Sequence, residues 1–164
     1  MPYFPDGAAG NEIHYRLHLR ALGEASLSED GVQSTLVIRF TWLRTFDRPV
    51  VLRVDSAGYN LWQLHTKAGS GLGGYEPGPL THHATRPLTN AQMDTLRTRL
   101  AAGEFWTLPS HAGALGMDGE QWILEVREGA RYHYIDRWCP RDGLAYDVGR
   151  ELMILSEYDL GPID

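Results

Sequence analysis

The side chains best suited to chemistry lie between Gly116 and Pro140. Residues 121–127 and 131–138 alternate polar and apolar side chains around Glu128-Gly129-Ala130, which is typical of a β-hairpin. Pairing of Arg127 with Tyr132 would fix which side chains share each face. Tyrosine and arginine often dominate the binding energy of protein interfaces. The hairpin region therefore supplies the candidate binding residues, which are Asp118, Glu125, Tyr132, His133, Tyr134, Asp136 and Arg137.

The same hairpin allows two other interpretations. A small-ligand or enzyme site would need four of its side chains to converge on one cleft, namely Asp118, Glu125, His133 and Arg137. Alternatively, the two faces are stabilised by ordinary cross-strand pairs, one face carrying His133 and Arg137 and the other Glu125. The pairing also places Trp122 opposite Arg137, where a cation–π contact is expected. The sequence assembles no catalytic motif, so no catalytic residue is predicted.

Motifs that could hold a cofactor or a metal are incomplete. Residues 69–74 match the pattern G-x-G-x-x-G, but the prolines within 75–79 prevent the helix that would bind a dinucleotide pyrophosphate. His14 and His18 fall on an expected strand about 13 Å apart, too far to chelate one ion. The adjacent histidines 82–83 would point to opposite faces of a strand. We therefore predict neither a cofactor nor a metal site.

The remaining patterns predict the elements that position these residues. Alternation with a period of two predicts strands over residues 12–20, 34–43, 50–55, 59–67 and 80–86. Thr89-Asn90-Ala91-Gln92 is a capping box that starts a helix ending near Gly103. Residues 105–109 are expected to be extended, and a second helix is expected from Leu144 to Tyr158. The predicted fold is a single α+β domain, residues 1–164, with a mainly antiparallel β-sheet and two α-helices, one after the first set of strands and one at the C-terminus.

Composition and charge exclude several classes of protein. The 164 residues carry a net charge of −6, and acidic side chains predominate from Asp142 onward. Because such a chain repels phosphate backbones, nucleic-acid binding is not expected. No apolar run approaches the roughly 20 residues that span a membrane, and the first residues lack the pattern of a secretory signal. The single cysteine, Cys139, suits a reducing compartment, so we predict a cytoplasmic protein.

Several short motifs from Trp42 onward resemble an uncharacterised bacterial protein family. They are Trp42-Leu43-Arg44-Thr45-Phe46, Gly73-Gly74-Tyr75-Glu76-Pro77-Gly78, Phe105-Trp106-x-Leu108-Pro109, Gly116-x-Asp118-Gly119-x-x-Trp122-x-Leu124-Glu125, Tyr132-His133 and Asp136-Arg137-Trp138-x-Pro140. Cys139 departs from the pattern, which has a small polar residue there. The resemblance implies a small bacterial cytosolic protein and assigns no catalytic residue.

These observations favour a non-enzymatic protein-binding module. The best hypothesis is a bacterial immunity protein or antitoxin that covers a cognate toxin or effector, because acidic surfaces speed association with basic partners. The alternatives are a small-ligand-binding protein or enzyme with its site on residues 116–140, and a subunit that only oligomerises. The expected partner is a protein, possibly a basic toxin, and neither nucleic acid nor a membrane is expected. The sequence does not determine the oligomeric state.

Overall fold

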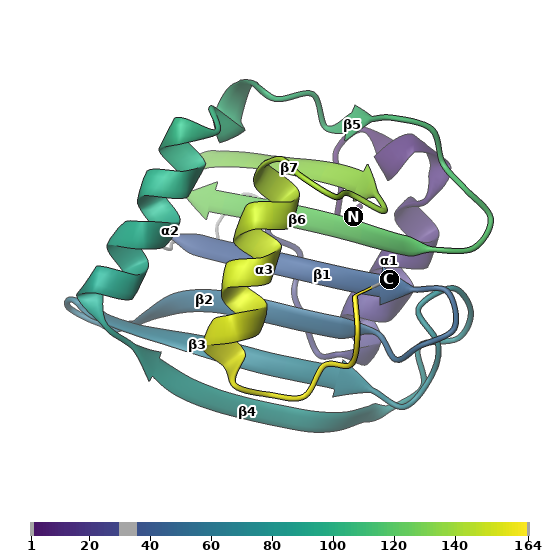
Figure 1. The fold of residues 1–164 in the computed structure, drawn as a ribbon, viewed down its shortest axis with the longest axis horizontal. Coiled ribbons are helices and arrows are strands. Elements are labelled where there is room, and N and C mark those ends of the chain that lie inside the picture. The colour runs from purple at the N-terminus through teal and green to yellow at the C-terminus, as the bar shows by residue number, and fades with distance from the viewer. Residues whose placement is uncertain (1, 30–35, 164) are drawn as a thin grey trace.

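The protein is built around one twisted β-sheet with helices on both faces, as the computed structural model of residues 2–29 and 36–163 shows (Figure 1). The sheet has seven strands in the order β4-β3-β2-β1-β6-β7-β5. In chain order the elements are η1 (Gly7–Gly10), α1 (Glu12–Ala21), β1 (Val37–Arg44), β2 (Val50–Gly58), β3 (Leu61–Gly69), β4 (Leu80–Leu88), α2 (Asn90–Ala102), η2 (Phe105–Thr107), β5 (His111–Ala112), β6 (Glu120–Glu128), β7 (Arg131–Trp138) and α3 (Leu144–Ser156).

The predicted α+β class and the mainly antiparallel sheet are confirmed. All neighbouring strands pair antiparallel except the two-residue β5, which runs parallel to β7. The predicted pairing of Arg127 with Tyr132 is present in the β6–β7 hairpin. Residues 34 and 35, where the second strand was expected to begin, lie outside the described residues. No helix of the described chain combines the length and apolarity that crossing a bilayer requires.

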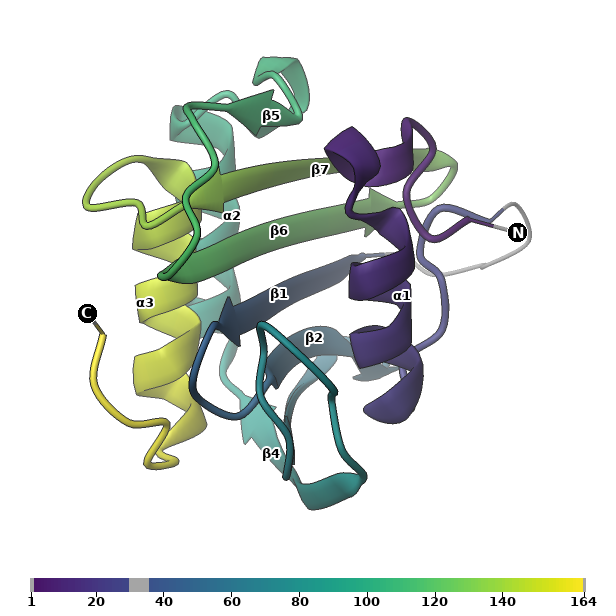
Figure 2. The ribbon, with the colours of Figure 1, turned by 90° about the vertical axis from the view of Figure 1, so that its right-hand side faces the viewer.

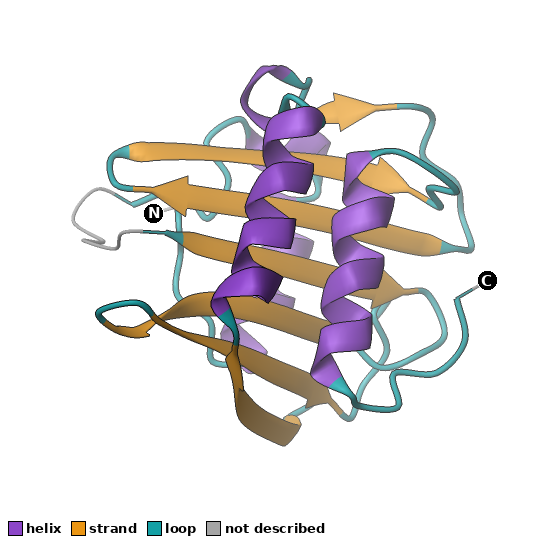
Figure 3. Ribbon diagram, turned by 60° about the vertical axis from the view of Figure 1, so that its left-hand side comes forward, coloured by secondary structure: helices purple, strands orange, loops and turns teal. Residues whose placement is uncertain are grey.

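Two layers of apolar side chains hold the helices against the sheet. Helices α2 and α3 lie side by side over one face, and α1 lies over the other (Figures 2 and 3). The larger core, beneath α2 and α3, includes Phe40, Trp42 and Trp122, which are fully buried. The smaller core, beneath α1, includes Tyr15 and Leu19. Both faces of the central strands are therefore buried, which explains why β1 has no exposed residue.

The prediction of a strand over residues 12–20 is wrong, because this segment forms α1. Its apolar residues satisfy both periods, but only the helical period matches the observed burial. Tyr15 and Leu19, four residues apart, are buried, whereas Ile13 and Leu17 are 63% and 50% exposed. The sheet face beneath needs a cover, and a helix supplies one apolar stripe while satisfying its own backbone hydrogen bonds. The fold consequently has three α-helices rather than the predicted two.

The helix-start and helix-end signals of the second half are confirmed, with one correction. Thr89 and Gln92 form the reciprocal capping box at the start of α2. Residues 105–109 are not a uniformly extended segment, because residues 105–107 form the single turn η2. The reason is the core: Phe105 is fully buried in the larger core, where its ring packs edge-on against His133.

For the variant Gly149→Ala, helix propensity predicts a more stable protein, whereas packing predicts a less stable one. Propensity alone predicts that Gly149→Ala stabilises α3 by about 1 kcal/mol. A Cβ at this position, however, would lie 2.8 Å from Trp122 and 2.9 Å from Phe40, both fully buried. We expect Gly149→Ala to lower the free energy of unfolding by about 1–3 kcal/mol, measured by urea denaturation. A stabilised variant would contradict this packing.

Candidate functional site

The seven candidate binding residues lie on both faces of the sheet and in one loop. Strand alternation directs four of them toward the α1 face of the sheet: Glu125, Tyr132, Tyr134 and Asp136. His133 and Arg137 point to the other face, and Asp118 is exposed in the loop before β6. The four side chains proposed to meet in one cleft, Asp118, Glu125, His133 and Arg137, are therefore not brought together.

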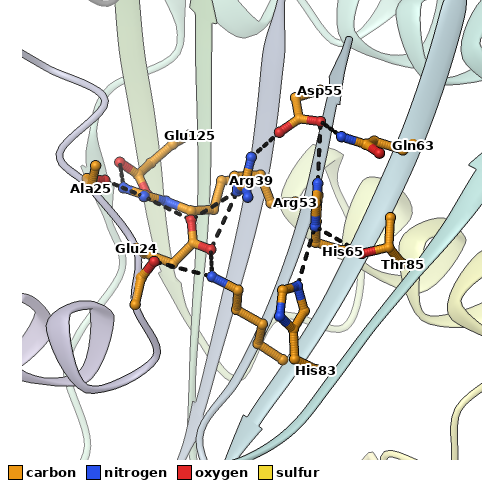
Figure 4. Close-up of polar contacts among 12 residues, drawn as sticks. Glu24, Ala25, Arg39, Arg53, Asp55, Gln63, His65, His83, Thr85 and Glu125 are labelled. Carbon is orange, nitrogen blue, oxygen red and sulfur yellow. Dashed lines mark hydrogen bonds and ion pairs between the residues drawn. The ribbon is translucent and has the colours of Figure 1, made fainter. Parts of the chain in front are cut away.

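Glu125 belongs to a buried ion pair in the centre of the sheet (Figure 4). Arg39 donates to both of its carboxylate oxygens, from Nε at 2.7 Å and from Nη2 at 2.8 Å. Both side chains are fully buried. Burial lowers the pKa of Arg39, but the Glu125 carboxylate more than offsets it, so the pKa lies above its ordinary value. Tyr132 also donates to Glu125, at 2.9 Å. These contacts make Glu125 a structural residue.

Glu24, which follows α1, extends the ion pair across the sheet. Its carboxylate lies 3.3 Å from Arg39 Nη1, 3.0 Å from Arg53 Nε and 2.7 Å from Lys67 Nζ. Burial alone would raise the pKa of Glu24, but these three cations lower it below its ordinary value. Asp55 also contacts Arg53, so three carboxylates balance three cations on the α1 face. No sequence pattern predicts this cluster, because its members come from four different strands and from the segment after α1.

Asp136 lies in a second buried polar cluster, between α1 and β6. It accepts from Tyr15 Oη at 2.8 Å and from the side-chain amide of Gln121, and His111 Nδ1 lies 3.6 Å away. Burial raises the pKa of Asp136, although these hydrogen bonds oppose it. Tyr134 contacts His111 and Asp6 nearby. Asp136 is therefore a buried carboxyl whose two oxygens accept hydrogen bonds within the fold.

His133 and Arg137 contact the backbone of the segment that precedes β5 and hold it against β7. His133 Nε2 lies 2.8 Å from the carbonyl oxygen of Leu108. Arg137 donates to the carbonyl oxygens of Pro109 and Ser110 at 2.9 and 3.1 Å. The ring of Trp122 stacks on Tyr146, with centroids 5.5 Å apart, rather than receiving the Arg137 guanidinium as expected.

A hollow of about 260 Å³ lies at one end of the sheet. Its floor includes Tyr15, Gln121 and Trp138, and three neighbouring segments form its walls: the start of α1, the β3–β4 loop and the β5–β6 loop. Tyr75 and Met117 stand on its rim and are 58% and 94% exposed. The full lining is Asn11, His14, Tyr15, Leu43, Thr45, Gly73, Gly74, Tyr75, Leu115, Gly116, Met117, Gln121 and Trp138.

More exposed apolar side chains surround this rim. Leu115 lines the hollow and is 56% exposed, and Phe46 is 64% exposed with its ring centroid 6.2 Å from that of Tyr75. Sequence reasoning missed the rim residues, since single exposed apolar residues are common in loops. The available signal was Tyr75, an aromatic residue in a Gly/Pro-rich segment of the kind that forms surface loops.

Glycines let the loops approach closely enough to form the hollow. A Cβ on Gly73 would lie 2.6 Å from the backbone of Arg44, and one on Gly116 would lie 2.5 Å from Trp138 Nε1. No helix follows residues 69–74, because residues 70–79 form the β3–β4 loop. The amides of Gly71 and Leu72 donate to the carbonyl oxygens of Pro77 and Glu76 within that loop. They therefore do not face outward as a phosphate cradle would require.

The expected 13 Å separation of His14 and His18 is wrong, because both lie on α1 one turn apart. Their ring centroids are 4.4 Å apart. His14 Nε2 contacts the carbonyl oxygen of Gly73 at 2.8 Å, and His18 Nε2 contacts that of Leu72 at 3.2 Å. Burial and then His18 lower the pKa of His14. Rather than forming a metal site, the two histidines dock the β3–β4 loop on α1.

Comparison with known proteins adds no assignment. No protein-family model matches the chain, and a search of curated proteins gives no match. The resemblance to an uncharacterised bacterial family, and the cytoplasmic location inferred from composition, stay predictions.

Proposed function

We propose that the protein is a non-enzymatic protein-binding module, specifically a bacterial immunity protein or antitoxin that inhibits a cognate toxin or effector by direct binding. The observation that carries the proposal is the hollow with its exposed apolar rim. Large exposed apolar side chains around a concavity mark interaction surfaces, and aromatic residues in such positions often supply most of the binding energy. The volume of about 260 Å³ suits one or two side chains of a partner better than a whole cofactor.

Charge supports a basic partner. The net charge of −6 would accelerate encounter with a positively charged protein. Asp118, one of the predicted binding residues, is exposed beside the hollow, whereas Asp47 in the adjacent depression pairs with Arg44. Glu151 of α3 pairs with Arg99, and Glu157 after α3 pairs with Arg86, so part of the acidic charge at that end of the chain is balanced. We therefore place the binding surface at the hollow and not along α3.

The test uses the products of the genes adjacent to its own as candidate toxins. One of them should form a stable complex and lose toxicity on co-expression, with an interface of more than about 1,000 Å². Tyr75→Ala should weaken that complex at least about 30-fold, measured by surface plasmon resonance, as expected for a hot spot of 2 kcal/mol or more.

Tyr59→Ala is the matched control. Tyr59 is 93% exposed at the β2–β3 turn and does not line the hollow, so its replacement should leave the affinity unchanged. The proposal fails if neither adjacent gene product binds, or if the two tyrosine variants weaken the complex equally.

The polar floor of the hollow favours a second candidate, a small-ligand-binding protein or enzyme with part of its site on residues 116–140. Gly116, Met117, Gln121 and Trp138 come from that region. Gln121 and Tyr15 line the hollow and both donate to the buried Asp136 carboxylate, so the floor presents oriented polar groups to a ligand. Binding of a small ligand would depend on the polar side chains of the floor, whereas binding of a protein would depend on the apolar side chains of the rim. Binding lost in Gln121→Leu but kept in Met117→Ala would favour this second candidate.

A further inference from the structure

Two histidines face each other on the open part of the α1 face, away from the hollow. His65 of β3 pairs with Thr85 of β4, and Lys67 pairs with His83, so the histidines are diagonal neighbours on one face. His65 Nδ1 and His83 Nε2 are 3.3 Å apart (Figure 4). We propose that this pair binds a divalent transition-metal ion of the Zn²⁺ type through these two nitrogens.

The separation of the two nitrogens suits a shared ion. Zinc–imidazole bonds of about 2.0–2.1 Å at a tetrahedral angle place two nitrogens about 3.3 Å apart, so an ion can replace the proton of the hydrogen bond between the two rings with little movement of either ring. The Thr85 hydroxyl lies 3.1 Å from His65 Nδ1, on the same side. His83 and Thr85 are exposed, so an ion can enter from solvent and complete its coordination with water.

Asp55 holds His65 in the form that can bind a metal. Its Oδ1 lies 3.3 Å from His65 Nε2, and Gln63 donates to the same carboxylate oxygen at 2.9 Å. When the Nε2 proton is shared with Asp55, Nδ1 presents its lone pair toward His83. A carboxylate that orients a ligating histidine through its other nitrogen is the usual outer partner of zinc sites. Burial would raise the pKa of Asp55, but the hydrogen bonds from His65 and Gln63 keep it below its ordinary value.

The surroundings limit the site to two protein ligands without excluding a cation. Within residues 2–29 and 36–163, no group of three or more His, Cys, Asp or Glu side chains is arranged to hold a metal. Lys67 and Arg53 lie on the same face, but Glu24 contacts both, which balances part of their charge. Burial, and then the charges of Lys67 and His65, lower the pKa of His83 below its ordinary value, which favours the neutral ring that binds a metal ion. The Nε2 atoms of His14 and His18 are not available to a metal ion in the same way, because each already contacts a backbone carbonyl oxygen.

The test is calorimetric titration of tag-free, chelator-treated protein with ZnCl₂ at neutral pH. We expect one ion per chain and loss of the binding heat in His65→Ala and in His83→Ala. Asp55→Asn should weaken binding about 10- to 100-fold. His82→Ala is the matched control: its ring stacks on Tyr158, with centroids 3.8 Å apart, on the opposite face of β4, so this variant should bind like the wild type.

Two outcomes would overturn the proposal: wild-type protein that gives no saturable heat, or a His83→Ala variant that binds as tightly as His82→Ala. Circular dichroism will confirm that each variant is folded, and His83 is exposed, so its replacement leaves the cores intact. Imidazole ¹⁵N NMR provides a second readout, in which Zn²⁺ should shift the His65 Nδ1 and His83 Nε2 signals and leave those of His82 in place.

Discussion

Replacing Arg39 with methionine is expected to lower the free energy of unfolding by about 3–5 kcal/mol, because removing one member of a buried ion pair leaves the other charge without compensation. Arg39 and Glu125 are both fully buried, and Arg39 also contacts Glu24, which is 2% exposed. Urea denaturation monitored by fluorescence measures the loss.

The double variant Arg39→Met/Glu125→Leu should recover much of that stability, since replacing both members of such a pair with apolar groups leaves no stranded charge. Arg16→Met is the matched control, because Arg16 pairs with Glu12 at 3.4 Å while 28% exposed. Its loss should be below about 1 kcal/mol. If Arg39→Met costs no more than Arg16→Met, the interior pair contributes little and our account of the α1 face is wrong.

Replacing Glu120 with leucine is expected to cost about 3–5 kcal/mol. One oxygen of this carboxylate accepts from the indole nitrogens of both Trp42, at 2.6 Å, and Trp122, at 2.8 Å. Glu120 is 2% exposed and both tryptophans are fully buried. Hydrogen bonds to a charged group contribute about 1.5–3 kcal/mol each, and the two buried donors would lose their acceptor.

Glu120→Gln separates hydrogen bonding from packing. Glutamine keeps an acceptor oxygen of similar reach, so we expect it to lose only about 1 kcal/mol. The near-ultraviolet circular dichroism of the tryptophans should change in Glu120→Leu and stay close to that of the wild type in Glu120→Gln. Equal losses of unfolding free energy in the two variants would indicate that Glu120 stabilises the core through its ionic charge or its packing and not by accepting hydrogen bonds.

Local patterns in the sequence were sufficient to predict most of the strands and two of the three α-helices. The β6–β7 register followed from a short turn, which in the structure is Gly129-Ala130, and from the strand patterns on both sides, which involve only neighbours along the chain. The start of α2 followed from Thr89 and Gln92, whose reciprocal hydrogen bonds form within one turn. The prediction of a strand over residues 12–20 was wrong because the apolar residues there fit both a strand and a helix. The segment forms a helix because it covers the sheet face that α2 and α3 leave uncovered.

The sequence by itself thus determined the class of fold, the hairpins and which hairpin side chains share a face. Only the tertiary structure decided what those side chains do. Because β1 pairs with both β2 and β6, Arg39 meets Glu125, and because α1 crosses the same face, Glu24 joins them. The hollow likewise needs loops that are far apart in the chain to close against α1. Contacts of this kind depend on strand order and helix placement, which leave no periodic trace in one sequence.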